Sequence, residues 1–255
     1  MRIAIVTGAS SGLGTEYVNC LAGSFCKELC LDQIWVTARR QDRLLALKER
    51  FGDRIVPIPA DLSEPSGIAS LIQALDTSEP EVAVLVNCAG FGTIGPLSEQ
   101  DPARQGSMTE VNVRALTELT TAVLPRMKKG AFVVNVCSIA AFAPNPNMTV
   151  YCSTKAYVLS FSKSLRFEEK KKGINVLAVC PGPMDTEFLP VAGIERGVSK
   201  TFDTLPRCDP KKVACRSLTL AGKGRGVYTP RLFFKFYRVL CKIFPHAWMM
   251  HLSKT

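Results

Sequence analysis

Six short apolar segments, each followed by a stretch long enough for a helix, constrain the fold of this chain more than any other feature. They are residues 3–6, 34–38, 55–59, 82–86, 132–136 and 174–179. The segments lack polar alternation, as expected of strands that are covered on both faces. Strands that alternate with helices pair in parallel through crossover connections. We therefore expect a single-domain α/β fold, a doubly wound parallel sheet with helices on both faces and ligands at the carboxyl ends of its strands.

A glycine-rich turn follows the first apolar segment, before a helical stretch that begins near Thr15. Its sequence is Thr7-Gly8-Ala9-Ser10-Ser11-Gly12-Leu13-Gly14. Glycines let the backbone approach a pyrophosphate closely, and the free amides and positive dipole end of the next helix attract its charge. The turn is typical of a dinucleotide site, with a purely structural strand-to-helix turn as the alternative, because one such match is weak.

The second apolar segment ends in Arg39 and Arg40, where a dinucleotide with a free ribose 2′-hydroxyl usually meets an acidic residue. Arginine holds a phosphate through charge-assisted, often bidentate hydrogen bonds, so the pair favours a 2′-phosphorylated dinucleotide. A solvated basic turn is the alternative. After the third segment, Asp61 and Leu62 would suit an adenine contact, and Asp61 would equally suit a helix cap.

Tyr151 and Lys155 stand four residues apart, and Ser138 precedes Tyr151 by thirteen residues. On a helix, residues four apart share a face. An unperturbed tyrosine titrates near pH 10, and a neighbouring ammonium favours its ionised form. The spacing is typical of a general acid–base pair, although Tyr and Lys also fall at this spacing by chance.

Together these motifs resemble the short-chain dehydrogenase/reductase family, in its compact single-domain branch, over roughly residues 1 to 190. The matching motifs are Thr7-Gly8-x-x-x-Gly12-x-Gly14, Asn87-Cys88-Ala89-Gly90, Asn112, Ser138, Tyr151-x-x-x-Lys155 and Pro181-Gly182-x-x-x-Thr186. The resemblance implies a Rossmann-like fold. It also implies an NADP(H)-dependent oxidoreductase that interconverts a carbonyl and a secondary alcohol by hydride transfer. Cys88 departs from the pattern, since many members have a second asparagine there.

The resemblance also assigns four catalytic roles. Tyr151 would be the general acid/base, and Lys155 would lower the pKa of Tyr151 and hold the nicotinamide ribose. Ser138 would hydrogen-bond the reacting oxygen, and Asn112 would anchor a water in a proton relay. Two cysteines, Cys137 and Cys152, flank these residues; we expect them to be small apolar packing residues.

Cofactor contacts follow from the same resemblance. Thr186 would hold the nicotinamide carboxamide, and Arg39 matches the family's position for the phosphorylated cofactor. The expected NADP(H) contacts are Thr7, Gly8, Ser10, Ser11, Gly12, Leu13, Gly14, Arg39, Arg40, Asp61, Leu62, Asn87, Ala89, Gly90, Tyr151, Lys155, Pro181, Gly182 and Thr186.

The expected substrate contacts lie in the loops before Tyr151 and after Thr186. They are Ser138, Phe142, Met148, Tyr151, Phe188 and Leu189. Because most of these side chains are apolar, the composition favours a bulky, lipophilic ketone or alcohol, such as a hydroxysteroid or an acyl-chain ketone.

Composition narrows the function classes. The ten cysteines show no C-x-x-C pair and there are two histidines, so we expect neither a metal site nor a disulfide framework. The chain enters its first strand directly and has no apolar run of about twenty residues, so we expect a cytoplasmic protein without a membrane span. Residues 210–255 hold ten Lys or Arg and no acidic residue, which accounts for the whole net charge of +10. A nucleic-acid footprint would have to lie in this tail, and we do not expect one.

The tail, residues 230–255, is expected to form a helical extension of a catalytic domain that covers residues 1–229. Residues 231–244 lie between two prolines and predict an apolar helix with one basic stripe, made by Arg231, Lys235, Arg238 and Lys242. Three partners fit this helix: the substrate cleft and core of its own subunit, another subunit, or an anionic membrane at the inner surface, contacted through residues 231–252. Trp248, Met249 and Met250 favour the membrane.

Two other functions share these motifs. One is a non-catalytic dinucleotide sensor or membrane-surface regulator, against which the intact Ser138, Tyr151 and Lys155 argue. The other is a sugar-nucleotide epimerase, for which the chain is short. The resemblance further implies a homo-oligomer, a dimer or tetramer, formed through the helices that carry Asn112 and Tyr151.

Overall fold

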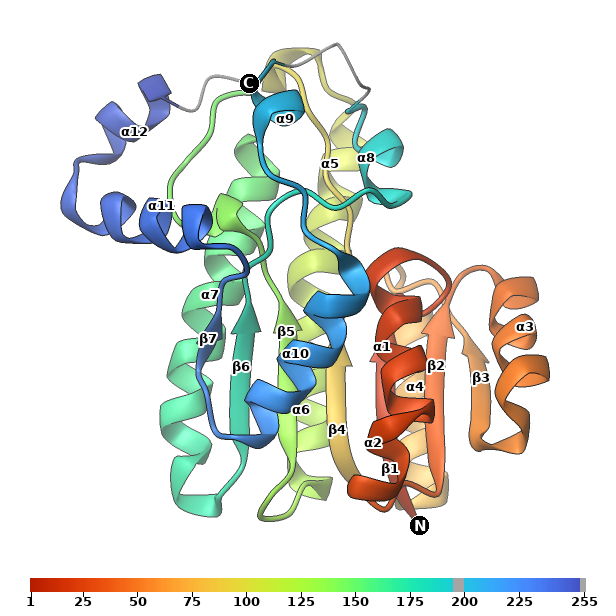
Figure 1. Ribbon diagram of the computed structural model, residues 1–255. Coiled ribbons are helices and arrows are strands. Elements are labelled where there is room, and N and C mark those ends of the chain that lie inside the picture. Colours follow the sequence, from red (N-terminus) through yellow and green to blue (C-terminus); the bar gives the residue numbers. More distant parts are fainter. Residues whose placement is uncertain (195–199, 253–255) are drawn as a thin grey trace.

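Seven parallel strands form one sheet in the computed structural model, which describes residues 1–194 and 200–252 (Figure 1). The strands are β1 (Arg2–Thr7), β2 (Gln33–Ala38), β3 (Ile55–Pro59), β4 (Glu81–Asn87), β5 (Phe132–Val136), β6 (Asn175–Val179) and β7 (Val227–Tyr228). Their order across the sheet is β3-β2-β1-β4-β5-β6-β7, and every neighbouring pair is parallel. The predicted doubly wound sheet is confirmed. Only β7, two residues long, escaped prediction, because so short a strand has no apolar run of its own.

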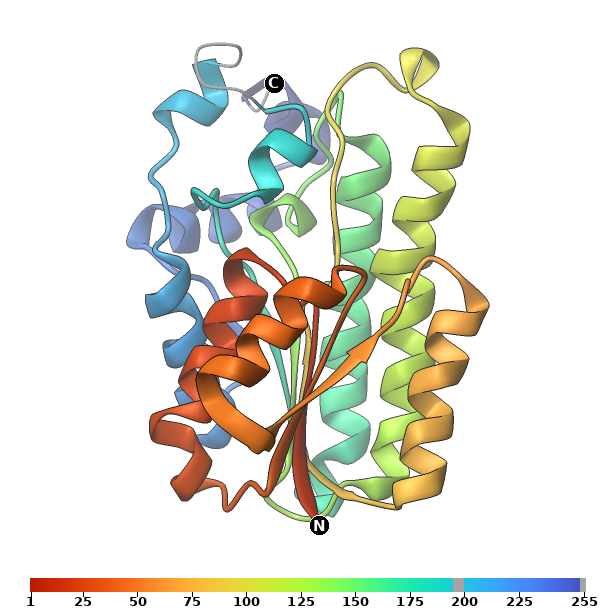
Figure 2. The same ribbon diagram turned by 90° about the vertical axis from the view of Figure 1, so that its right-hand side faces the viewer.

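Helices cover both faces of the sheet, as the edge-on view shows (Figure 2). One layer holds α1 (Gly12–Ala22), α2 (Ser24–Glu28), α3 (Gln41–Phe51) and α10 (Pro210–Gly222), and the other holds α4 (Pro65–Ser78), α5 (Pro102–Thr109), α6 (Leu116–Val123) and α7 (Thr149–Glu169). The π-helix η3 (Glu110–Ala115) joins α5 to α6. Short 3-10 turns lie at η1 (Gly52–Arg54), η2 (Leu97–Glu99), η4 (Leu124–Arg126), η5 (Ile139–Ala141) and η6 (Lys170–Lys172). Beyond the carboxyl ends of the strands lie α8 (Phe188–Val191), α9 (Lys200–Thr204), α11 (Leu232–Ile243) and α12 (His246–Leu252).

The core consists of two apolar layers, one on each face of the sheet. Alternate residues of a strand point to opposite faces. On β1, Ala4 and Val6 therefore join the cluster under α1, α3 and α10, whereas Ile3 and Ile5 join the cluster under α4, α6 and α7. Full burial of an isoleucine or valine side chain contributes about 1.5–3 kcal/mol, so the uninterrupted apolar strands stabilise both layers at once.

Local signals set the helix ends. Asp209 accepts a hydrogen bond from the Lys212 amide at 3.1 Å, and Pro210 follows it as the first residue of α10. This is the usual helix start, because an acidic cap satisfies a free amide and proline needs none. At the other end of a helix, α3 stops at Gly52, whose φ of +76° favours glycine.

A disulfide links α1 to α10, the two neighbouring helices on one face. Cys20 and Cys215 are paired with their Cα atoms 5.7 Å apart, and nearby the Tyr17 hydroxyl lies 2.7 Å from Ser217 Oγ. The expectation of no disulfide framework is therefore wrong at this position. The two cysteines are 195 residues apart, so only the packing of the two helices brings them together, and no local spacing reveals the pair.

The predicted tail helix forms as α11, between Pro230 and Pro245. It lies beyond the carboxyl ends of β6 and β7 and continues into α12 (Figure 1). Phe234 is fully buried in the core, and Cys241 and Met249 are also buried. One face of α11 thus packs on its own subunit. In the described part of the chain, no helix is long and apolar enough to cross a membrane.

Candidate active site

A cavity of about 590 Å³ lies at the carboxyl ends of the strands, where open parallel sheets bind their ligands. Every predicted cofactor residue lines this cavity except Thr7 and Asn87. The glycine turn, the arginine pair and the Tyr151–Lys155 helix therefore face one common space, although they come from distant parts of the sequence. Its size is that of a typical small-molecule site.

Thr7 and Asn87 support the cavity wall from behind. Thr7 Oγ1 accepts hydrogen bonds from the backbone amides of residues 88 and 89, both at 3.0 Å. Asn87 Nδ2 donates to Asn135 Oδ1 at 2.8 Å and to Thr120 Oγ1 at 2.9 Å. Both side chains are buried. Thr7 and Asn87 therefore do not face the cavity. They hold in place the segment after β4, which does line it.

At Gly8, Gly12 and Gly14 of the glycine turn, a side chain would crowd neighbouring atoms. A Cβ at Gly14 would lie 2.0 Å from the carbonyl oxygen of Gly8, and a Cβ at Gly12 would lie 3.1 Å from Thr186 Cβ. Gly8 and Gly12 also have positive φ angles, +69° and +52°, which favour glycine. Ser11, the residue before α1, makes no side-chain cap, so the first amides of α1 stay available. These residues fit a pyrophosphate.

Arg39 lies at the outer end of the cavity, beside Asp61. Burial opposes ionisation of the Asp61 carboxyl, but hydrogen bonds from Ser63 and the positive charge of Arg39 hold its pKa below the usual range. The carboxylate accepts bonds from the Ser63 amide at 2.9 Å and from its hydroxyl at 2.7 Å. Asp61 thus stabilises the turn before α4 and also lines the cavity. Among the described residues, Arg39 makes no ion pair, so its guanidinium is available to a ligand.

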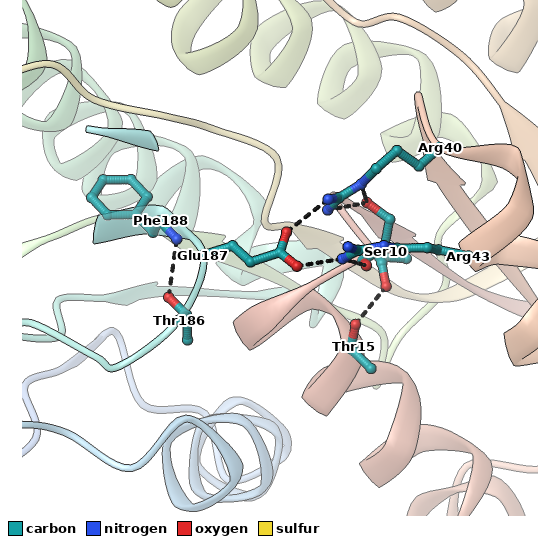
Figure 3. A network of polar contacts seen from close by, with 8 residues as sticks. Ser10, Thr15, Arg40, Arg43, Thr186, Glu187 and Phe188 are labelled. Carbon is teal, nitrogen blue, oxygen red and sulfur yellow. Dashed lines mark hydrogen bonds and ion pairs between the residues drawn. The ribbon is translucent and has the colours of Figure 1, made fainter. Parts of the chain in front are cut away.

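Glu187 bridges two arginines across the mouth of the cavity (Figure 3). Its carboxylate lies 2.7 Å from Arg40 and 2.5 Å from Arg43, and both arginines also donate to Ser10. Neither Arg43 nor Glu187 was predicted from the sequence. Arg43 lies in the first turn of α3, three residues after the predicted pair Arg39 and Arg40, and this closeness in sequence could have indicated its role. Nothing local points to Glu187, because its partners are about 145 residues away.

Ser138, Tyr151 and Lys155 meet on the opposite side of the cavity. Tyr151 and Lys155 lie one turn apart on α7, and Ser138 hydrogen-bonds Tyr151 from the start of η5. The Lys155 Nζ donates to the Val136 carbonyl at 2.9 Å and lies 5.7 Å from the centre of the Tyr151 ring. The predicted phenol, hydroxyl and ammonium therefore form one cluster.

The two titrating members of this cluster have shifted pKa values. Burial raises the pKa of Tyr151, and the hydrogen bond from Ser138 offsets this only in part. Burial also lowers the pKa of Lys155, because it disfavours the ammonium. Burial is the dominant influence on the pKa of this phenol, and the expectation that Lys155 lowers it stays a prediction. At neutral pH the phenol of Tyr151 keeps its proton and can donate it.

Asn112 lies in the π-helix η3, buried behind the cavity wall. Its Nδ2 donates to the Phe91 carbonyl at 2.9 Å and to Thr154 Oγ1 at 3.1 Å, and its Oδ1 accepts from the Phe91 amide at 3.1 Å. The side chain thus joins the loop after β4 to α7, the helix of Tyr151. A Cβ at Gly90 would lie 2.8 Å from Asn112 Oδ1, so glycine is required for this approach.

The substrate half of the cavity is apolar. Met148, Phe188 and Leu189 line it as predicted, and the ring of Phe188 lies 5.7 Å from that of Tyr151. Phe142 does not line it: the ring is buried in the apolar cluster formed with residues of α7 and α11, and its centre lies 6.3 Å from that of Tyr237. This corrects its assignment as a substrate contact.

The tail closes this half of the cavity. Lining side chains from α11 and α12 are Phe233, Phe234, Tyr237, Leu240 and Met249. The sequence offered the cleft as one of three partners for the tail but did not identify these residues, because an apolar helix does not reveal which of its sides faces inward. The cysteines beside the cluster, Cys137 and Cys152, are buried as expected.

Comparisons of the sequence with known proteins give one consistent result. The family model described as short chain dehydrogenase matches residues 2–194. A short chain dehydrogenase of Pseudocercospora fijiensis is 34% identical over 194 residues, which are 73% of this chain and 61% of that protein. An NADP-dependent 3-hydroxy acid dehydrogenase of Salmonella typhi is 29% identical over 217 residues, 83% of this chain and 85% of that protein.

Solved structures agree with the sequence comparisons. A short-chain dehydrogenase from Sphingobium yanoikuyae in complex with NADPH has a TM-score of 0.79 at 28% identity, and the match covers 98% of this chain and 96% of that one. A bulky-bulky ketone specific alcohol dehydrogenase from Comamonas testosteroni has a TM-score of 0.74 at 27% identity, with 100% and 95% covered. A 3-ketoacyl-(acyl-carrier-protein) reductase from Brucella melitensis, complexed with NADH, has a TM-score of 0.76 at 25% identity, with 90% and 96% covered. The similar proteins thus include complexes with both nicotinamide cofactors.

Proposed function

Because this chain belongs to the short-chain dehydrogenase family of oxidoreductases, we propose that it is an NADP(H)-dependent enzyme that interconverts a carbonyl and a secondary alcohol. The observation that carries the proposal is the meeting of Ser138, Tyr151 and Lys155 on the cavity wall that faces the glycine turn. A protein that only sensed the cofactor would have no use for a buried phenol beside a hydroxyl and an ammonium.

The cofactor would lie along the residues that fit its parts. The amides at the start of α1 would hold the pyrophosphate, Arg39 the 2′-phosphate, and Thr186 the carboxamide. Asp61 and Leu62 would border the adenine. When bound, NADPH supplies the hydride for carbonyl reduction.

The protein's own side chains would handle the proton. The phenol of Tyr151 would donate its proton to the carbonyl oxygen as that oxygen gains negative charge. The Ser138 hydroxyl would hydrogen-bond the same oxygen and hold it at the phenol. The Lys155 ammonium would stabilise the phenolate that remains. Asn112 would act as a positioning residue, because it fixes α7 against the loop after β4.

Cofactor binding is the first test of this proposal. Titration of nicotinamide fluorescence with the purified protein is expected to show tighter binding of NADPH than of NADH. A ketone screen with NADPH should then give turnover. Binding without turnover of any carbonyl substrate would instead favour a non-catalytic dinucleotide sensor. Absence of binding would rule out both the enzyme and the sensor.

Replacing Arg39 by aspartate is expected to reverse the cofactor preference. The variant loses a charge-assisted hydrogen bond to the 2′-phosphate and adds a like charge, so the ratio of the NADH and NADPH dissociation constants should change by about a hundredfold. NADH affinity should stay within a few-fold of wild type, which serves as the internal control. An unchanged ratio would show that Arg39 does not bind the 2′-phosphate.

Glu187→Gln is expected to change NADPH binding in the opposite direction, and the same titration measures it. Glu187 pairs with Arg40 and Arg43 beside the predicted phosphate position, so its carboxylate opposes the charge of a 2′-phosphate. The amide variant is expected to strengthen NADPH binding by about fivefold, the effect of one exposed ion pair of about 1 kcal/mol, and to leave NADH binding unchanged. Equal effects on both cofactors would contradict this placement of the two arginines.

The pH dependence should differ between the two reaction directions. Reduction needs the protonated phenol of Tyr151, whose pKa is raised by burial, so the reduction rate should be flat between about pH 6 and 9. Alcohol oxidation needs the phenolate, so its rate should rise by about tenfold per pH unit over the same interval. Steady-state kcat values in both directions provide the measurement. An oxidation rate that is level across this interval would contradict Tyr151 as the base.

The apolar half of the cavity supports a proposal for the substrate class. Met148 and Phe188 line this half together with Phe233 and Tyr237 of the tail, so its walls are mostly apolar and aromatic. We propose a bulky, lipophilic ketone or alcohol, and the similarity to a bulky-ketone alcohol dehydrogenase supports this class. Comparing kcat/KM for steroid ketones, long acyl-chain ketones and acetone tests it; a preference for acetone would refute it.

A further inference from the structure

The outer face of α11 is an exposed apolar ridge, which we define as Leu232, Phe236, Val239 and Ile243. These residues are spaced by four, three and four positions, so they fall on one face of the helix. Leu232 is 81% exposed, Phe236 64% and Ile243 68%. The opposite face, with Phe234 and Cys241, is buried. The helix therefore has two apolar faces, and only the inner one is covered by its own subunit.

The apolar ridge continues beyond the end of α11. Phe244 and Trp248 are exposed and stack with their ring centres 6.1 Å apart, while Met249 of the same short helix points inward and is buried. Proteins that stay free in water rarely expose a contiguous apolar surface of this kind, which usually marks a protein or membrane contact. Aromatic side chains with a polar tip, such as Trp248, suit the boundary between water and lipid.

A line of basic residues borders the ridge on one side. It is formed by Arg231, Lys235, Arg238 and Lys242, which follow the same spacing along α11. From residue 210 to the end of the chain there are ten Lys or Arg and no acidic residue. The partner of the ridge must therefore be apolar at its centre and negatively charged at its edge. A second copy of this face would bring two basic lines together, which like-charge repulsion opposes.

We propose that α11 and α12 dock this protein on an anionic membrane surface, with the apolar ridge in the headgroup boundary and the basic line on the lipid phosphates. A helix with a large apolar face, a basic border and aromatic residues is suited to lie in this plane. Anionic lipids also attract Lys and Arg that stand within a Debye length of the surface. The membrane contact is peripheral, because α11 has 12 residues and lies flat on its own subunit.

The docked position places the cavity next to the lipid. Phe233 and Leu240 are seven residues apart, on the edge of α11 opposite the basic line, and both line the cavity while remaining partly exposed. The wall of the cavity is thus continuous with the surface that meets the membrane. A lipophilic ketone could pass from the bilayer around this edge to Tyr151. This part of the inference rests on the proposed function, whereas the docking itself does not.

Vesicle flotation of the full-length protein tests the docking. At low salt, the wild-type protein is expected to float with vesicles of phosphatidylcholine and phosphatidylglycerol and to stay behind with phosphatidylcholine alone. Phe236→Glu/Ile243→Glu should abolish flotation, because it places charges in the ridge. Lys235→Gln/Lys242→Gln should lower the partition coefficient by about 25-fold, since each basic residue near an anionic surface contributes roughly fivefold.

Phe167→Glu is the matched control, because Phe167 is 82% exposed on α7, away from the ridge. It should float like the wild type. Flotation of all variants alike, or of none including the wild type, would overturn the docking. So would a loss of oligomer mass in Phe236→Glu/Ile243→Glu without any vesicle binding by the wild type, which would assign the ridge to a second copy.

An activity measurement separates this inference from the proposed function. Phe236 and Ile243 do not line the cavity, so Phe236→Glu/Ile243→Glu should reduce a water-soluble ketone at the wild-type rate. With a lipophilic ketone dissolved in anionic vesicles, the same variant should be at least about tenfold slower than the wild type at equal protein concentration, because it no longer binds the vesicles that hold the substrate. If the protein floats normally but is inactive, the proposed enzymatic function is refuted and the membrane docking stands. Equal rates of both proteins on the vesicle-borne ketone would refute substrate entry from the lipid.

Discussion

Replacing Tyr151 by phenylalanine is expected to lower kcat for ketone reduction by about a thousandfold, within the usual range for loss of a general acid. The substitution removes the proton donor and keeps the ring that packs against Phe188. Cofactor affinity should change little, because the phenol hydroxyl faces the reacting oxygen more than the dinucleotide. Rapid-mixing measurement of NADPH oxidation, together with fluorescence titration of NADPH, separates the two effects.

Tyr157→Phe is the control for this experiment. Tyr157 lies on the same helix and also carries a hydroxyl with a partner, Thr117 Oγ1 at 2.9 Å, but it is exposed and does not line the cavity. Its loss should leave kcat within twofold of wild type, since surface substitutions of this kind have small effects. Substantial activity in Tyr151→Phe would refute the proposed mechanism, and an equal loss in both variants would indicate a structural cause.

Replacing Phe234 by alanine is expected to destabilise the protein by about 3–5 kcal/mol, the usual cost of removing a buried phenylalanine ring. Phe234 is fully buried, although it belongs to the tail. Its ring rests directly on the backbone of Gly182: a Cβ at that glycine would lie 2.1 Å from the ring. The contact fastens α11 to the loop after β6, and it also forms part of the cavity wall.

Thermal unfolding measures this effect. Phe234→Ala should lower Tm by roughly 10 °C for a chain of this size. Phe236→Ala, two residues further along the same helix, removes the same ring from an exposed position and should change stability by at most about 0.5 kcal/mol. Gly182→Ala should resemble Phe234→Ala, because its methyl group would displace the ring. Equal effects of Phe234→Ala and Phe236→Ala would show that α11 is not fastened through this contact.

Local patterns in the sequence were sufficient for the sheet and for the cofactor half of the site. An apolar strand reads as a continuous run, and a glycine turn followed by a helix start occupies only a few residues. Six of the strands were therefore located to within about two residues of their observed ends. Gly8, Gly12 and Arg39 could also be placed from the sequence. Each follows directly after a predicted strand, and the carboxyl ends of these strands border the cavity.

Longer-range features required the tertiary structure. Phe142 was predicted to contact the substrate from its place in a loop, but a loop residue can turn to either side, and packing with Tyr237 determines its direction. Glu187 meets Arg40 and Arg43 only because the segment after β6 crosses to α3.

The sequence by itself determined the positions of six strands along the chain, the glycine turn and the spacing of Tyr151 and Lys155, because each of these is encoded within a few neighbouring residues. The tertiary structure alone decided which side of the apolar tail helix faces inward. Both sides of α11 are apolar, so hydrophobicity does not distinguish them. The fit of the Phe234 ring on the bare backbone of Gly182 buries one side and leaves the ridge of Phe236 and Ile243 exposed.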